Sequence, residues 1–91
     1  MAVSVLLTVD LNRNVSEASR KVFNEKLAEL KWNRLSLTTS WTARFVEGAT
    51  IEAALSTAKG DVAQAAAAAG VSNYEAAAQA GHQSVEIWRK P

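Results

Sequence analysis

The stretch Val-Ser-Val-Leu-Leu-Thr-Val at positions 3–9 decides the fold class, because its side chains alternate in character. Aliphatic residues take every odd position, whereas Ser4, Leu6 and Thr8 take the even positions. Alternation of this kind predicts a β-strand, and β-branched residues favour one. Asp10 ends the apolar run far short of the ~20 residues that a membrane span needs, and no basic segment precedes it. We therefore expect a central strand here and neither a signal peptide nor a membrane anchor.

A helix is predicted to follow the first strand. Asn14 and Glu17 have the spacing of a capping box, which predicts that the helix begins there. The apolar residues of segment 15–32 recur every three or four positions, so they would share one helical face. These residues are Val15, Ala18, Val22, Phe23, Leu27 and Leu30.

Residues 35–45 alternate as cleanly as the first strand, with Leu35, Trp41 and Phe45 among the odd positions. This pattern predicts β structure with one solvated face. The unbroken alternation favours one long strand, whereas typical strand lengths favour a hairpin that turns near residues 38–40. The sequence leaves both arrangements open.

An alanine-rich block follows, for which we expect three short helices. Thr50 would cap the first helix and Gly60 would end or kink it. Asp61 would cap a second helix over 62–69, which Gly70 would end. A capping box of Ser72 and Glu75 would begin a third helix over 74–80, and Gly81 would end it.

Residues 84–89 alternate once more and predict a final strand. The order strand, helix, strand or hairpin, helical block and strand predicts one ferredoxin-like α/β sandwich over residues 1–91, with helices on one face of an antiparallel sheet. Leu6 and Trp88 would then lie on the uncovered sheet face. That face, or the adjoining edge strand, is our candidate dimer surface, although Trp88 would equally suit a lone surface aromatic.

Composition narrows the classes of site. The 91 residues include ten basic and nine acidic side chains, one histidine and no cysteine. Disulfides and thiolate zinc sites are therefore excluded, and no overall charge attracts nucleic acid or a membrane. A chain this small gains stability from a second copy, so we expect a homodimer. The lack of an export signal favours the cytoplasm.

Asp10 is the first candidate for chemistry, since it follows the first strand. In a dimer, two such carboxylates could share one Mg²⁺, although Asp at this position is also a common turn residue. Basic side chains cluster in and beside the first helix, where they would suit phosphate contacts. A solvated helix of mixed charge is the competing interpretation, because Glu17, Glu25 and Glu29 interrupt the cluster. Its members are Arg13, Arg20, Lys21, Lys26, Lys31 and Arg34, with Arg44 as an extension.

Two further patterns carry less chemistry. Ala66, Gly70 and Ser72 have the spacing of a helix-turn-helix, but residues 61–86 contain no Lys or Arg to contact phosphates. We therefore interpret the pattern as helix packing. His82 could act as a general base, but the sequence assigns it neither an acidic partner nor a nucleophile.

The first half of the chain resembles a known group of proteins. The motif Val-Leu-Leu-Thr-Val-Asp at positions 5–10, with a helix ending Leu-Ala-Glu-Leu-Lys at 27–31, is similar to the opening of small dimeric ferredoxin-like nucleases. These are the CRISPR-associated adaptation nucleases and VapD-type proteins, and GhoS-type endoribonuclease antitoxins are similar. The resemblance implies a homodimer that acts on RNA or DNA phosphodiesters, with Asp10 as the strand-end carboxylate. The helix-rich second half departs from those families.

Together these observations favour a small homodimeric binding or regulatory module without a recognisable catalytic site or cofactor. The alternative is a metal-dependent endoribonuclease that uses Asp10 and Mg²⁺, with Arg13, Arg20 or Arg34 contacting the nucleic acid. A DNA-binding helix-turn-helix protein is the third interpretation.

Overall fold

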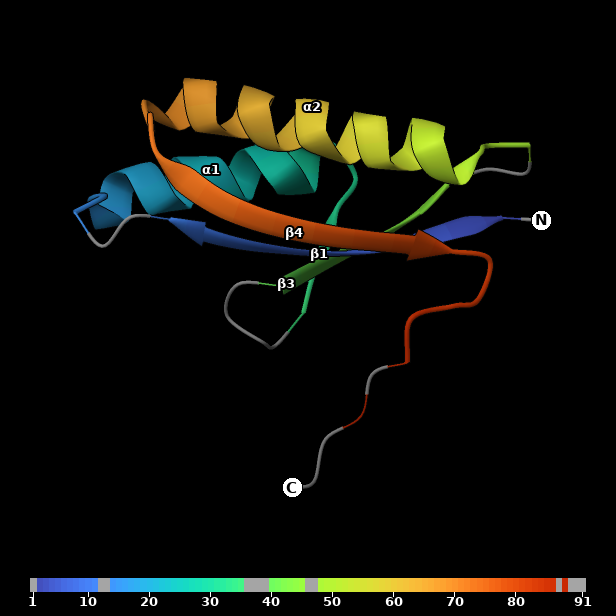
Figure 1. Cartoon of the computed structure of the whole chain (residues 1–91). Helices are drawn as coiled ribbons and strands as arrows, with labels where there is room; N and C mark the ends of the chain where they lie inside the picture. Colours follow the sequence, from blue (N-terminus) through green and yellow to red (C-terminus); the bar gives the residue numbers. More distant parts are fainter. Residues whose placement is uncertain (1, 12–13, 36–39, 46–47, 87, 89–91) are drawn as a thin grey trace.

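Six elements follow one another in the order β-α-β-β-α-β (Figure 1). The computed structural model of the chain describes residues 2–11, 14–35, 40–45, 48–86 and 88. The elements are β1 (Val3–Leu11), α1 (Glu17–Glu29), β2 (Asn33–Arg34), β3 (Ser40–Phe45), α2 (Ile51–Ala69) and β4 (Tyr74–Gly81).

The four strands form one antiparallel sheet in the order β2-β3-β1-β4. Both helices lie on the same face of this sheet (Figure 1). This order and this one-sided helix layer are those of the ferredoxin-like fold, which confirms the predicted architecture. The last strand lies beside the first, as expected.

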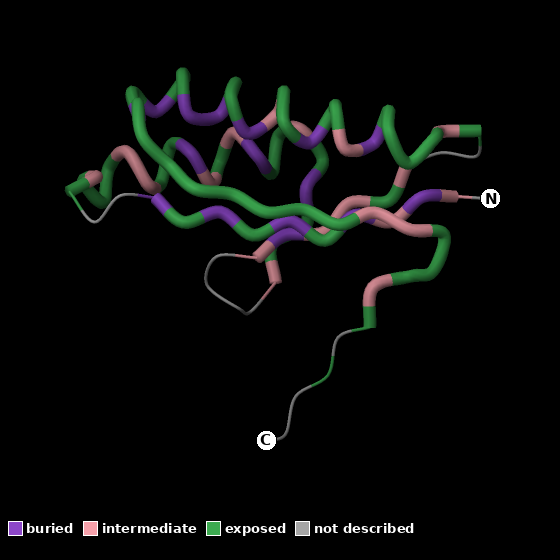
Figure 2. Tube along the Cα trace, viewed as in Figure 1, coloured by how far each residue is buried: buried purple, intermediate pink, exposed green. Residues whose placement is uncertain are grey.

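The core lies between the sheet and the helices, and β1 is its floor. The odd residues of β1 are buried and its even residues are mostly exposed, so the predicted alternation is confirmed (Figure 2). Phe23 and Leu27 of α1 pack against β1 in this core, and Trp32 and Trp41 complete it on the β3 side. All four side chains are buried.

Both ends of α1 differ from the prediction in detail. Ser16 is the N-cap, because its hydroxyl accepts a hydrogen bond from the Ser19 backbone N–H at 3.1 Å. The predicted cap at Asn14 is therefore wrong. Val22, which was expected on the buried face of the helix, is 41% exposed. The helix ends in a Schellman turn with Lys31 at φ 77°. The Trp32 N–H then donates to the Leu27 carbonyl at 3.0 Å, which turns the chain back toward the core.

The segment that alternates over 35–45 forms part of a hairpin. The short β2 pairs with β3, with Arg34 opposite Trp41. The alternative prediction of one long strand is therefore wrong. The connecting residues 36–39, including Leu37, lie outside the described part of the chain. The expected sidedness holds at Trp41, which is buried under the helices.

α2 is one continuous helix rather than two. Thr50 caps it, and Gly60 lies within it without a break. Asp61 is not a cap: its Oδ2 accepts a hydrogen bond from the Trp32 indole Nε1–H at 2.9 Å. A mid-helix glycine costs only about 1 kcal/mol, and burial of the neighbouring Ala58 and Val62 outweighs this cost. Neither described helix combines the length and apolar character needed to cross a membrane.

β4 is the largest departure from the sequence prediction. Residues 74–81 are a strand, whereas the sequence predicts a third helix over 74–80. The described part of the predicted last strand over 84–89, residues 84–86 and 88, is not a strand. Gly70, at φ 71°, ends α2, and the chain then returns along β1. Pairing with β1 satisfies the backbone hydrogen bonds on one side of β4. Tertiary context therefore overrides the helix preference of alanine.

Candidate functional site

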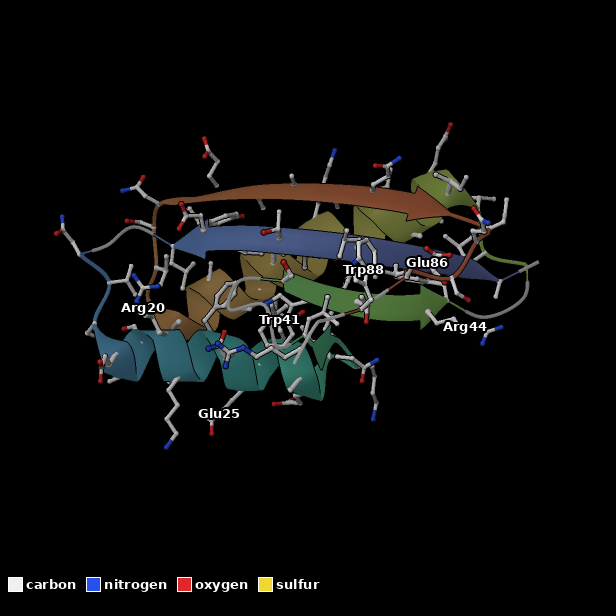
Figure 3. All side chains as sticks on the ribbon, turned by 90° about the horizontal axis from the view of Figure 1, so that it is seen from below. Arg20, Glu25, Trp41, Arg44, Glu86 and Trp88 are labelled. Atoms are coloured by element: carbon white, nitrogen blue, oxygen red, sulfur yellow. The ribbon has the colours of Figure 1, made fainter. Side chains whose placement is uncertain are left out.

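The sheet face opposite the helices carries mainly polar side chains (Figure 3). The register places alternate residues of β1, β3 and β4 side by side on this face. They are Ser4, Leu6, Thr8 and Asp10 of β1, Ser40, Thr42 and Arg44 of β3, and Glu75, Ala77, Gln79 and Gly81 of β4. We call this surface the open face.

Two carboxylates meet on the open face at one end of the sheet. Asp10 is exposed and lies directly opposite Glu75 in the β1–β4 register. Side chains opposite one another in an antiparallel pair have their Cβ atoms about 5 Å apart. Mg²⁺ is commonly held by one or two carboxylates and several waters, so this pair suits such an ion. Within the described residues no group of three His, Asp or Glu side chains could hold a metal.

A polar hollow of about 410 Å³ lies in the helix layer at this same end of the sheet. Ser16 and Ser19 from the start of α1 line one side of it, and Gly70, Ser72 and Asn73 line the other. The first backbone N–H groups of a helix favour an anion. The hollow therefore favours an anion, whereas the pair of Asp10 and Glu75 favours a cation.

The candidate arginines do not gather around Asp10. Arg20 and Arg34 line one shallow hollow of about 610 Å³ beside α1, together with Glu17, Lys21 and Glu25, and Asp10 is not among its lining residues. The Arg34 guanidinium stacks over the Trp41 ring at 5.7 Å. Arg44 lies on the open face at the opposite end of the molecule from Arg20 (Figure 3), so it does not extend the cluster. Arg13 lies outside the described residues.

His82 lies far from both carboxylates. It follows β4, which pairs with β1 at Ser4, whereas Asp10 is six residues further along the same strand. At about 3.3 Å per residue the two side chains are about 20 Å apart. The His82 Nδ1 lies 3.4 Å from the Ala2 carbonyl oxygen. No acid–base pair of His82 and Asp10 can therefore form within one chain.

The helix-turn-helix interpretation is wrong at its second helix. The residues that would read DNA belong to β4, a strand paired along its length with β1. The segment from Gly70 onward is therefore the turn into a sheet strand, and it offers no helix for the major groove.

The predicted dimer residues separate in the structure. Leu6 lies at the centre of the open face and is 39% exposed, as expected. Trp88 is 83% exposed and lies outside any strand, on the chain segment that leaves the sheet on its uncovered side (Figure 1). In the described part of the segment expected to form the last strand, residues 84–86 and 88, there is no strand to bring the two residues onto one face. The prediction for Trp88 is therefore wrong in its placement, and Leu6 alone remains on the sheet.

The sequence does not identify β4, a largely exposed strand at the edge of the sheet. Every residue from Tyr74 to Gln79 is exposed, although β4 is hydrogen-bonded to β1 on one side (Figure 2). The strand contains no lysine, arginine or proline, and its pairing with β1 continues without a bulge. Lysine, proline and bulges commonly protect an edge strand from further pairing, so β4 lacks this protection.

A groove of about 460 Å³ accompanies this edge between β4 and α2. Most of its lining side chains are apolar, and Lys59 and Tyr74 are the lining residues whose side chains carry a polar group. Its lining residues are Leu7, Leu55, Ala58, Lys59, Val62, Tyr74, Ala76, Ala77 and Ala78. Strand edge and groove together form a surface with open backbone groups beside an apolar channel. We call it the β4 edge.

The chain matches no protein-family model, no curated protein and no solved structure.

Proposed function

We propose that this chain is a small binding module that accepts an extended polypeptide strand along the β4 edge. The exposure of β4 is the observation on which this proposal rests. The outer side of an edge strand presents unpaired backbone N–H and C=O groups, and an added strand satisfies them. The neighbouring groove offers apolar contacts to alternate side chains of the added strand, which would supply selectivity.

The proposal is tested by NMR on the isotope-labelled full chain with a capped synthetic peptide that has the sequence of residues 73–82. We expect the peptide to shift the backbone amide signals of 74–81 and of the groove residues Leu55 and Lys59. The control is the same peptide with N-methyl groups on alternate backbone amides, which cannot add to a sheet. Equal shifts with both peptides, or none with either, would overturn strand addition.

A metal-dependent endoribonuclease is the second candidate function. The observation that favours it is the position of Asp10 opposite Glu75, which offers Mg²⁺ two carboxylate ligands. In this function Mg²⁺ would activate a water molecule for attack on the RNA phosphodiester. Arg20 and Arg34 line a different surface, so they would bind the RNA away from the metal.

The endoribonuclease is tested by incubating the purified chain with RNA and Mg²⁺, beside D10A and E75Q variants. Cleavage by the unsubstituted chain that both substitutions abolish would support the metal site. Cleavage of equal rate in all three samples would remove both carboxylates from the mechanism.

A further inference from the structure

The β4 edge is self-complementary, and this property identifies its partner. On the premise that β4 accepts a strand, as proposed above, we infer that the strand is β4 of a second copy of this chain. The two strands would run antiparallel about a two-fold axis that passes through Ala77. The two four-stranded sheets would then join into one continuous sheet.

The side chains of β4 select this register. Residues directly opposite one another in an antiparallel pair point to the same face of the sheet. With the axis at Ala77, Glu75 lies opposite the partner's Gln79 on the open face, and this pair occurs twice. The Gln79 amide can donate to the Glu75 carboxylate, and this hydrogen bond is charge-assisted. A shift of the axis to Ala76 or Ala78 would instead place Glu75 opposite the partner's Ala77 or the partner's Gly81.

The same register suits the helix side of the sheet. Ala76 lies opposite the partner's Ala78, so only methyl groups meet below the groove. Neighbouring strands are about 4.8 Å apart, and the groove that α2 forms with Leu7 of β1 and Ala78 of β4 places the helix above both strands. The two copies of α2 would then run antiparallel about two strand spacings, or ~10 Å, apart, close to the 8–10 Å of packed helices.

This contact would close the groove. On the helix side Tyr74 of each copy would lie opposite the partner's Ala80. The groove residues Leu55 and Tyr74, whose apolar side chains now contact solvent, would then be covered. Lys59 also lines the groove and is exposed. Its aliphatic stem can cover the apolar floor while its ammonium group extends into solvent.

Disulfide trapping tests the register, because the chain contains no cysteine of its own. Residues on the two-fold axis of an antiparallel pair have Cα atoms about 4.5–5.5 Å apart, within disulfide range. We expect the A77C variant of the full chain to form a covalent dimer under mild oxidation. The matched control is A68C, an exposed alanine of α2 that does not line the groove, and L6C reports on an open-face dimer.

A charge series provides the second measurement, with the dimer dissociation constant taken from sedimentation equilibrium. Q79E places two like charges opposite one another twice per dimer, so we expect it to raise the Kd about 2- to 30-fold. The double variant E75K/Q79E should restore the Kd by making two ion pairs.

The outcomes separate the register from strand acceptance. A dimer that is trapped by L6C and not by A77C would overturn the inference, as would a Kd that Q79E leaves unchanged. A chain that stays monomeric and nevertheless binds the 73–82 peptide would overturn pairing between two whole chains and leave strand acceptance at the β4 edge standing. A monomer that binds no peptide would remove both.

Discussion

The hydrogen bond between Trp32 and Asp61 is the most sharply testable polar contact of the core. The Trp32 ring is 3% exposed, and its Nε1–H donates to the Asp61 carboxylate at 2.9 Å. The D61A variant leaves this buried indole N–H without its acceptor. Loss of a hydrogen bond to a charged group costs about 1.5–3 kcal/mol, and partial exposure of Asp61 favours the lower end. The better helix propensity of alanine returns up to about 0.7 kcal/mol.

We therefore expect D61A to lower the free energy of unfolding by about 1 kcal/mol, which corresponds to about 4–8 °C in Tm for a domain of this size. Urea unfolding followed by circular dichroism measures the change. A double-mutant cycle with W32F removes the contribution of helix propensity, and its coupling energy should be about 1.5 kcal/mol. The control is Q64A, at an exposed position of the same helix. A coupling energy within the ~0.5 kcal/mol of ordinary additivity would refute the reasoning.

Three substitutions test the backbone conformation within α2 and at the ends of α1 and α2, each by urea unfolding. G60A should raise the free energy of unfolding by about 0.5–1 kcal/mol, because Gly60 is helical and a Cβ there meets nothing within 4 Å. G70A should lower it by about 1–2 kcal/mol, since Gly70 has φ 71°; changes of equal sign at the two glycines would contradict this account. K31G should raise it by up to about 1 kcal/mol, because it relieves a left-handed residue and the more flexible unfolded chain offsets part of the gain. A loss of stability in K31G would show that the lysine side chain stabilises the turn.

The sequence was sufficient wherever burial is strong and periodic. Val3, Val5 and Leu7 share one parity and are all buried, so the first strand and its inner face could be predicted. Phe23 and Leu27 are spaced by four residues and both lie in the core. The predicted order of elements then led to the correct sheet topology, even though the last strand was assigned to the wrong residues.

β4 could not be predicted, because its polar residues fit two periods at once. Glu75 and Gln79 are four residues apart, which places them on one face of a helix and equally on one face of a strand. Alanine, the best helix former, fills most of the remaining positions and outweighs the strand interpretation. The vacant edge beside β1 decides between the two, and this edge exists only once the chain has folded.

The candidate site, too, could be predicted only in part from the sequence. Asp10 could be recognised from its place at the end of a strand, but its neighbour Glu75 was assigned to a helix. A cross-strand pair depends on register, and register depends on which strands are adjacent. The β4 edge was missed for the same reason, since its residues are exposed only as a consequence of the sheet order.

The three tryptophans of this chain divide into two optical classes. Trp32 and Trp41 are buried at 3% and 2% exposure, whereas Trp88 is 83% exposed. A collisional quencher in solvent should therefore extinguish the red-shifted part of the fluorescence and leave a blue-shifted remainder from the interior. A chain carrying W88F would emit only from the interior pair, so its spectrum would report the integrity of the packed layers without any attached dye.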